Sequence, residues 1–344
     1  MHDADAWYAL ACAQVGAAAA LRLLEAFQHP QAIFAATPRE WALRARLSAR
    51  GSERLLDAIN RDLAGEVARL EHLGIRMLSL QDADYPPRLR AIPDPPCVLF
   101  VKGTLPPPEQ GAIAIVGSRR ASLYGRHVAA ELATGLVQRG FAIVSGMALG
   151  ADAAAHEGCL RAGGRTVAVL GCGVDVIYPP EHTELYERIA ATGAVVSEFP
   201  PGAPPTRTTF PIRNRIISGL SAGVVVVEAP EKSGALITAD HALEQGREVF
   251  AVPGSVNSVQ SRGTHRLLRD GARLVECAED ILEELSWPSS PPPRAPLAGP
   301  SWDLAGPITL ATPPPVAKPA KQFPRSSRPT QPVQTPKPAA TMPV

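Results

Sequence analysis

Three arginines gather with an aromatic side chain and an amide in one short segment of the chain. Arg207, Phe210, Arg213, Asn214 and Arg215 lie within nine residues that hold no acidic side chain. Guanidinium groups match phosphate oxygens with two parallel hydrogen bonds, and an aromatic ring can stack against a nucleobase. A proline-rich loop leads into this segment, which continues as a helical stretch. The segment therefore predicts a site for phosphate groups and bases.

Two of these arginines also admit a structural interpretation. Arg213 and Arg215 are two positions apart on the predicted helix, so their side chains face different ways. One of them can pair with Glu198 or Glu228, which stand at the ends of two apolar runs. We expect one structural arginine here and at least one arginine that faces a ligand.

Three turns of small residues, each opening a helical stretch, add backbone and hydroxyl donors. The turns and their polar neighbours are Gly117-Ser118, Arg119, Ser145-Gly146, Ser233-Gly234 and Thr238. Glycine lets a backbone come close to a ligand, and the free N–H groups at a helix start favour anions. Any turn between a strand and a helix can use a glycine and a capping residue, so each turn alone is ordinary. The three together predict a ligand-binding edge.

The acidic side chains give weaker signals for catalysis. Glu198 and Glu228 could act as a general acid and base, and Asp152 and His156 have the spacing of two metal ligands on one helix face. A third ligand of suitable spacing is missing, and an Asp at a helix start is more often a cap. The sequence lacks GxGxxG, GxxxxGK[ST] and GxSxG. A hydride-transfer enzyme and a P-loop NTPase are therefore poorly supported, and we predict neither a catalytic residue nor a metal site.

The elements that must position these residues recur at a regular pitch. Seven aliphatic runs start 24 to 29 residues apart: AIAIV (112–116), FAIVS (141–145), TVAVL (166–170), AVVSEF (194–199), GVVVVEA (223–229), EVFAV (248–252) and ARLV (272–275). This is the pitch of one strand–helix unit, and strands that are apolar on both faces indicate a parallel sheet covered by helices. Residues 111–285 are therefore predicted to form a Rossmann-like, doubly wound, mostly parallel α/β domain. Its ligand loops follow the carboxyl ends of the strands.

The flanking segments differ in composition. Residues 1–80 have apolar positions at helical spacing and predict a small all-α module, and residues 81–110 predict an extended connector. Residues 286–344 hold 17 of the 36 prolines, six basic residues and one acidic residue. Such a segment buries too little apolar surface to offset its chain entropy, so we predict a disordered tail.

Whole-chain composition excludes several classes of protein. The 344 residues include 34 Lys and Arg and 33 Asp and Glu, a formal net charge of +1. Because residues 286–344 carry +5 of that charge, the rest carries −4, and bulk positive charge cannot hold nucleic acid. Five scattered cysteines without a CxxC pair argue against a disulfide framework or a zinc site. No apolar run is long enough to span a membrane, and we expect a cytoplasmic protein.

Six ordered motifs run through the predicted Rossmann-like domain: IVGSRRASLYG, VSGMALGADAAAHEG, EFPPG, FPIRNRIISGLS, VVVEAPEKSGALITADHALEQGREVFAVPG and GTHRLLRDGA. Together they resemble the DNA-processing protein A family, also called DprA or Smf. The resemblance implies a single-stranded-DNA-binding protein that protects incoming DNA and helps load the RecA recombinase in natural transformation. It also implies a homodimer formed through the Rossmann domain. No cofactor is expected.

The resemblance further implies which residues bind DNA. The family's pocket corresponds here to Arg119, to the Ser145-Gly146 turn and to the FPIRNR segment at 210–215. Three positions before the phenylalanine the family usually has a lysine, and this chain has Arg207, which keeps the charge. Many members end in a winged-helix domain, whereas this chain has proline-rich sequence in that place.

A nucleotide-hydrolysing enzyme is the alternative from another class. Related Rossmann proteins, the phosphoribohydrolases, use a PGGxGTxxE loop at a comparable sheet edge. The corresponding segment here, SGALITADH (233–241), lacks both the double glycine and the glutamate, and Asp240 is the nearest acid. This difference favours a DNA-binding protein that is not an enzyme.

Overall fold

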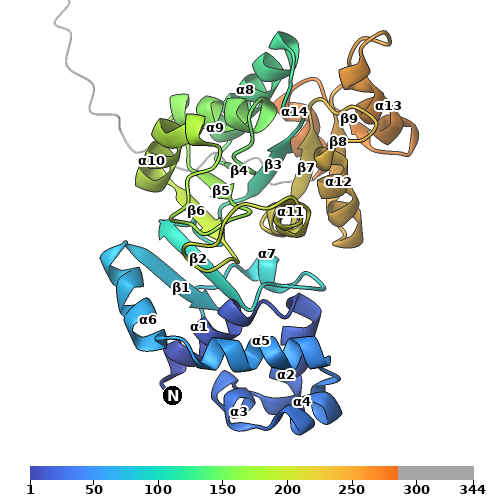
Figure 1. The fold of residues 1–344 in the computed structure, drawn as a ribbon. Helices are drawn as coiled ribbons and strands as arrows, with labels where there is room; N and C mark the ends of the chain where they lie inside the picture. Colours follow the sequence, from blue (N-terminus) through green and yellow to red (C-terminus); the bar gives the residue numbers. More distant parts are fainter. Residues whose placement is uncertain (286–344) are drawn as a thin grey trace, which may run out of the picture. The chain divides into compact units, whose positions relative to one another are not determined.

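A nine-stranded sheet organises the part of the chain that the computed structural model describes, residues 1–285 (Figure 1). Its strands, in spatial order, are β1 (Ile75–Ser79), β2 (Val98–Gly103), β6 (Ala194–Ser197), β5 (Thr166–Val169), β4 (Ala142–Ser145), β3 (Ala112–Val116), β7 (Gly223–Val226), β8 (Glu248–Ala251) and β9 (Arg273–Leu274). All pairs from β6 to β9 are parallel, and β2 pairs antiparallel with both β1 and β6. The predicted Rossmann-like α/β fold is confirmed, and β3 to β9 are the seven predicted strands.

The strand order reverses between β3 and β7. From β3 the chain builds outward through β4, β5 and β6, and then returns to place β7 on the other side of β3. In such sheets ligands bind beyond the carboxyl ends of the strands, at the point of reversal. The loops after β3, β4 and β7 meet there.

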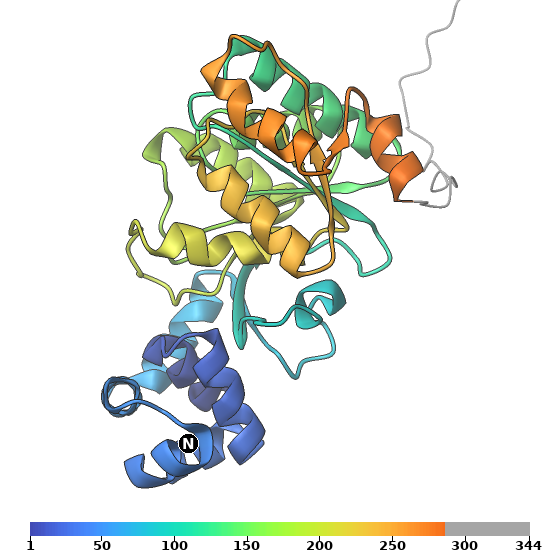
Figure 2. The same ribbon diagram turned by 90° about the vertical axis from the view of Figure 1, so that its right-hand side faces the viewer.

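Helices cover both faces of the sheet, and every residue of β3 is therefore buried. The side chains of β3 alternate between the two faces. Ile113 and Ile115 pack against α8 (Leu123–Gln138), α9 (Ala151–Arg161) and α14 (Ala278–Glu284). Ala114 and Val116 belong to a second cluster with α7 (Pro87–Arg90), α11 (Thr209–Gly219), α12 (Gly234–Glu244) and α13 (Arg262–Arg269). Helix α10 (Thr183–Thr192) packs beside β5 and β6. In both views α11 lies next to α7 (Figures 1 and 2).

Six short helices form the N-terminal module: α1 (Asp3–Ala13), α2 (Ala17–Phe27), α3 (Pro30–Ala35), α4 (Pro38–Ala45), α5 (Ala49–Ile59) and α6 (Leu63–His72). Local sequence fixes several starts. Thr37 and Glu40 form a capping box at α4, and Ser48 and Asp62 cap α5 and α6. The apolar core of the module includes Phe100 of β2, whose ring meets that of Tyr8 edge-on at 5.9 Å.

The structure differs from the sequence prediction at the junction between the two parts. Strand β1 lies inside the range predicted as all helical, and α7 and β2 lie inside the predicted connector of 81–110. Residues 98–101 of β2 are all buried, one face towards the N-terminal helices and the other towards the sheet core. The connector is therefore a structural bridge. Its abundant prolines masked a short strand that has no helix after it.

The remaining part of the chain is not described. By its internal contacts the chain divides into Met1–Arg294 and Ala295–Val344. The predicted proline-rich tail, residues 286–344, lies outside the described residues. Within residues 1–285, no helix is long and apolar enough to cross a bilayer.

Candidate nucleic-acid interface

A cavity of about 640 Å³ opens at the carboxyl edge of the sheet, between the loop after β3 and the first turns of α11 and α12. Ten of the thirteen predicted site residues line it: Gly117, Ser118, Arg119, Arg207, Phe210, Arg213, Asn214, Ser233, Gly234 and Thr238. They come from four loops and helix starts that are far apart in sequence. The topology thus brings together what the sequence presents as separate motifs.

The cavity is strongly cationic. Arg119, Arg120, Arg207 and Lys232 line it, and each is an exposed residue. Their side chains make no hydrogen bond or ion pair with any residue between 1 and 285. Asp152 is the one acid in the lining. This surplus of unpaired positive charge, on a chain whose described part is acidic overall, marks a local anion site.

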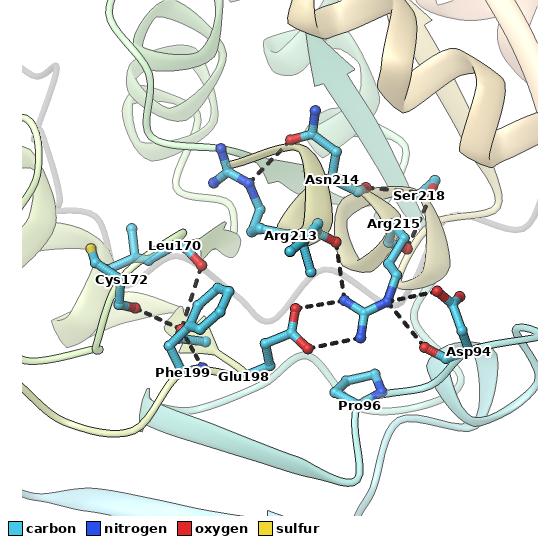
Figure 3. Close-up of polar contacts among 12 residues, drawn as sticks. Asp94, Pro96, Leu170, Cys172, Glu198, Phe199, Arg213, Asn214, Arg215 and Ser218 are labelled. Atoms are coloured by element: carbon cyan, nitrogen blue, oxygen red, sulfur yellow. Dashed lines mark hydrogen bonds and ion pairs between the residues drawn. The ribbon is translucent and has the colours of Figure 1, made fainter. Parts of the chain in front are cut away.

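Arg213 forms the floor of the cavity and is 4% exposed. Its Nη1 donates to the carbonyl of Gly146 at 2.8 Å and to that of Val169. Its Nε donates to Oδ1 of Asn214 at 3.2 Å, as Figure 3 shows. Burial lowers the pKa of Arg213 to about 10, and the nearby carboxylate of Asp152 opposes this shift. Arg213 therefore stays charged at neutral pH and supplies a fixed, internally held positive charge.

Arg215 points away from the cavity, on the other side of α11 (Figure 3). Its Nη1 and Nη2 donate to the two carboxylate oxygens of Glu198 at 2.6 and 2.8 Å, and its Nε lies 3.0 Å from Oδ2 of Asp94. Arg215 is 2% exposed. The prediction that one of the two helix arginines pairs with Glu198 or Glu228 is met by Arg215. Arg215 thus has two acidic partners on that side of the helix, and its assignment to the DNA-binding residues stays a prediction.

The Ser145-Gly146 turn lies beneath the cavity rather than in its lining. Ser145 is fully buried, and its hydroxyl donates to the carbonyl of Ile115 at 2.6 Å. The amide of Gly146 donates to Oδ2 of Asp152 at 3.1 Å. A Cβ at Gly146 would lie 2.8 Å from both Arg213 Nη2 and Asp152 Oδ2, so only glycine leaves room for these two side chains. Both residues support the floor, and their contact with DNA stays a prediction.

Asn214 joins the two helices that frame the cavity. Its Nδ2 donates to the carbonyl of Gly234 at 3.1 Å, while its Oδ1 accepts from Arg213. The hydroxyl of Ser233 caps α12 by accepting from the amide of Ala235 at 3.3 Å. The start of α12 is thereby held against α11 and faces the cavity.

The acidic candidates for catalysis are engaged in structural bonds. Glu228 accepts from the amide and hydroxyl of Ser122 at 2.8 and 2.7 Å, and Glu198 is paired with Arg215. Asp152 accepts from backbone amides, and its burial raises its pKa. Nδ1 of His156 lies 2.6 Å from the Thr166 hydroxyl. No group of three or more His, Cys, Asp and Glu residues suited to a metal ion occurs within residues 1–285.

A family model described as DNA recombination-mediator protein A matches residues 76–286. The chain belongs to this family. The family resemblance drawn from the six motifs is thus confirmed, and the match begins within β1, after the N-terminal helices.

Named relatives agree with this assignment. Protein Smf of Synechocystis is 47% identical over 214 residues, which cover 61% of this chain and 54% of that protein. DNA processing protein DprA of Bacillus subtilis is 45% identical over 220 residues, covering 64% of this chain and 74% of that protein. The match therefore spans little more than half of the Synechocystis protein.

Two solved structures of DNA processing protein A have the same architecture. The chain superposes on DprA of Streptococcus pneumoniae with a TM-score of 0.71 and 38% identity, covering 80% of this chain and 96% of that one. For DprA of Helicobacter pylori the TM-score is 0.55 and the identity 30%, covering 62% and 95%. The H. pylori structure concerns the single-stranded-DNA binding mode of that protein.

The predicted site left out several residues that line the cavity of this family member, Arg120 among them. Tyr178, Lys232 and Gln260 line it but were not among the predicted site residues. Tyr178 lies in the long loop after β5, and Lys232 directly precedes the Ser233-Gly234 turn. Their position after predicted strands was a usable signal. Their approach to Phe210 and α12 depends on loop conformation, which no local pattern specifies.

Proposed function

We propose that this chain binds single-stranded DNA in the cationic cavity at the carboxyl edge of its sheet. The observation that carries the proposal is the convergence of Arg119, Arg120, Arg207 and Lys232 on one cavity. Their side chains make no hydrogen bond or ion pair within residues 1–285. Backbone phosphates need such cations together with N–H donors of the kind found at the start of α12. The similarity to a DprA whose structure concerns single-stranded DNA supports this ligand class.

A single strand fits this site better than a duplex. The unpaired cations are gathered at one cavity, whereas the chain outside residues 286–344 carries a formal charge of −4. A duplex presents two phosphate rows and needs a broad basic face. A flexible single strand can bend its phosphates into a concave site and tolerates any base order.

We further propose the biological role that the family description suggests. As a recombination mediator, this chain would help load a recombinase, which we propose is RecA, on single-stranded DNA in natural transformation. Assembly as a homodimer through the Rossmann domain would bring two cavities into one particle. The proposed location is the cytoplasm, where incoming DNA and RecA meet.

Binding without catalysis is favoured over nucleotide hydrolysis. Glu198 and Glu228 are held by Arg215 and Ser122, so neither is free to move a proton at a substrate. The start of α12 also lacks the double glycine and glutamate of the phosphoribohydrolase loop. Incubation of the purified protein with nucleoside monophosphates should release no free base.

A titration of the full chain with single- and double-stranded oligonucleotides over a salt series tests the binding proposal. Arg119→Ala and Arg207→Ala should each weaken single-strand binding by about 1–3 kcal/mol and reduce the salt slope by roughly one phosphate. The melting temperature should hardly change, because exposed arginines contribute little to folding. Arg188→Ala, an exposed arginine on α10 outside the cavity, is the matched control. Equal affinity for duplex at moderate salt would contradict the proposal.

A further inference from the structure

Several groups pack against the ring of Phe210, which is half-buried and lines the cavity. The Arg119 guanidinium lies 5.1 Å from its centroid and that of Arg213 lies 5.9 Å away. A Cβ at Gly171 would come within 2.8 Å of Phe210 Cδ1, so the backbone after β5 also packs on this ring. The sequence suggested that Phe210 stacks directly on a base. These contacts cover part of the ring, and stacking of a base on Phe210 stays a prediction.

Tyr178 is the aromatic residue in the cavity with an open surface. Its ring centroid lies 5.6 Å from that of Phe210 with an interplanar angle of 36°, and 37% of the residue is exposed. Within residues 1–285 Tyr178 has no side-chain hydrogen bond. Arg119 and Tyr178 thus both contact Phe210, and the ring of Tyr178 borders the cavity.

The other exposed tyrosine of this region does not share these properties. Tyr124 lies outside the cavity lining, and its hydroxyl donates to the carbonyl of Pro253 at 2.9 Å. It is 50% exposed, so exposure alone does not distinguish the two rings. The difference is that Tyr178 shares one cavity with the unpaired cations, whereas Tyr124 does not.

We infer that Tyr178 is a stacking platform for a nucleobase, next to the cations that hold the phosphates. The inference rests on the proposed binding of single-stranded DNA. It assigns a contact to the base, whereas the arginines contact the phosphates. Each nucleotide carries one phosphate and one base. A strand whose phosphate is bound by these cations therefore also brings a base close to the cavity. Each base has a π face, so stacking on Tyr178 adds affinity without selecting a sequence.

The test compares oligothymidine with an abasic oligonucleotide of the same length, using the full chain at one salt concentration. Tyr178→Ala should weaken binding to oligothymidine on the order of tenfold and leave binding to the abasic strand unchanged. Tyr178→Phe should bind both strands as the unaltered protein does, because the hydroxyl has no partner. Arg207→Ala should weaken binding to both strands alike, and Tyr124→Ala should affect neither.

The outcomes distinguish failure of the Tyr178 platform from failure of the proposed single-stranded-DNA binding. If the unaltered protein binds no single strand, the proposed function fails. If Arg207→Ala weakens binding but Tyr178→Ala binds oligothymidine normally, only the platform is refuted. Equal losses on both strands for Tyr178→Ala would make Tyr178 a positioning residue for Phe210, which also refutes it. Tyr178→Leu, which keeps apolar bulk against Phe210, should show the same base-dependent loss if the alanine variant folds poorly.

Discussion

Arg213 and Arg215 are two positions apart on α11, and their side chains have different partners on different sides of the helix. Arg213 is bound to main-chain carbonyls and reaches the cavity floor, whereas Arg215 is neutralised by Glu198 and Asp94 on the far side of the helix. Helical spacing predicted that their side chains diverge, and Glu198 was one of the two partners predicted. The sequence could not say which arginine pairs, because that depends on which face of α11 meets the sheet.

Loss of Arg215 should destabilise the fold and spare the DNA site. Arg215→Ala leaves the carboxylate of Glu198, whose side chain is 15% exposed, without its cation. Breaking a buried pair from one side costs about 3 kcal/mol or more, and adding Glu198→Gln should restore part of that loss. Chemical denaturation measures the stability, and titration below the unfolding range should give unaltered single-strand affinity. A weakened affinity in a fully stable variant would place Arg215 in the binding site.

His156 should make the stability depend on pH. Burial lowers its pKa to about 3, and the charges of His182 and Arg213 contribute. The ordinary histidine pKa is about 6.5. Below that pH the imidazole of His156 is protonated in the unfolded chain and stays neutral in the folded chain. This part of the stability is present above pH 6.5 and is lost as the pH falls.

The expected size is about 1.4 kcal/mol between pH 7.5 and pH 5.5. His156→Asn keeps a donor for the Thr166 hydroxyl and has no titrating ring. Denaturant unfolding at the two pH values should therefore show a smaller loss for this variant. The same loss in both proteins would mean that other groups control the acid sensitivity.

The elements divide into those that the sequence predicts and those that it does not. Seven parallel strands were predicted from pitch and two-sided apolarity, because a buried strand with a helix on each side has a strong local pattern. Strands β1 and β2 were missed because the antiparallel pairing of β1 with β2, and of β2 with β6, is set by the sheet edge and by the N-terminal helices. Side-chain direction at the site depended on loop conformation in the same way. Tyr178 was therefore missed, and the burial of Ser145 and Gly146 was not predicted.

The start of α9 controls the conformation of the loop that carries Arg119. Gly150 has φ 84° and ψ −118°, and a Cβ there would lie 2.4 Å from the carbonyl oxygen of Ser118. That oxygen also accepts from the amide of Ala151 at 3.3 Å. Gly150→Ala should therefore displace the loop as well as strain the backbone.

Gly163 provides a matched comparison for this effect. It has φ +72°, and a Cβ there would meet no atom within 4 Å, so Gly163→Ala carries only the backbone cost of about 1–2 kcal/mol. Gly150→Ala should lose more stability than this and also weaken single-strand binding. Thermal melts and titrations of the two variants measure both effects. Identical behaviour would show that the loop tolerates the displacement.

At the scale of the whole molecule, charge is divided unevenly along the chain. Residues 286–344 carry a formal charge of +5 and the remaining residues −4. Every residue assigned to the site lies within residues 1–285, and the division of the chain by internal contacts falls at Arg294. The specific pocket and the excess positive charge are therefore on different segments, and their contributions to DNA binding can be separated by salt.

A shortened chain that ends at Leu285 separates the contribution of the pocket to DNA binding from that of the positive charge in residues 286–344. The shortened chain keeps the core of α14, including Ala278 and Ile281, so it should melt cooperatively at nearly the same temperature. At low salt it should bind single strands more weakly than the full chain, because charge without a defined site still attracts phosphate through counterion release. The difference should shrink as salt rises, while the losses caused by Arg207→Ala and Tyr178→Ala persist in both lengths. A shortened chain that aggregates, or that loses binding at every salt concentration, would place part of the fold or the site beyond Leu285.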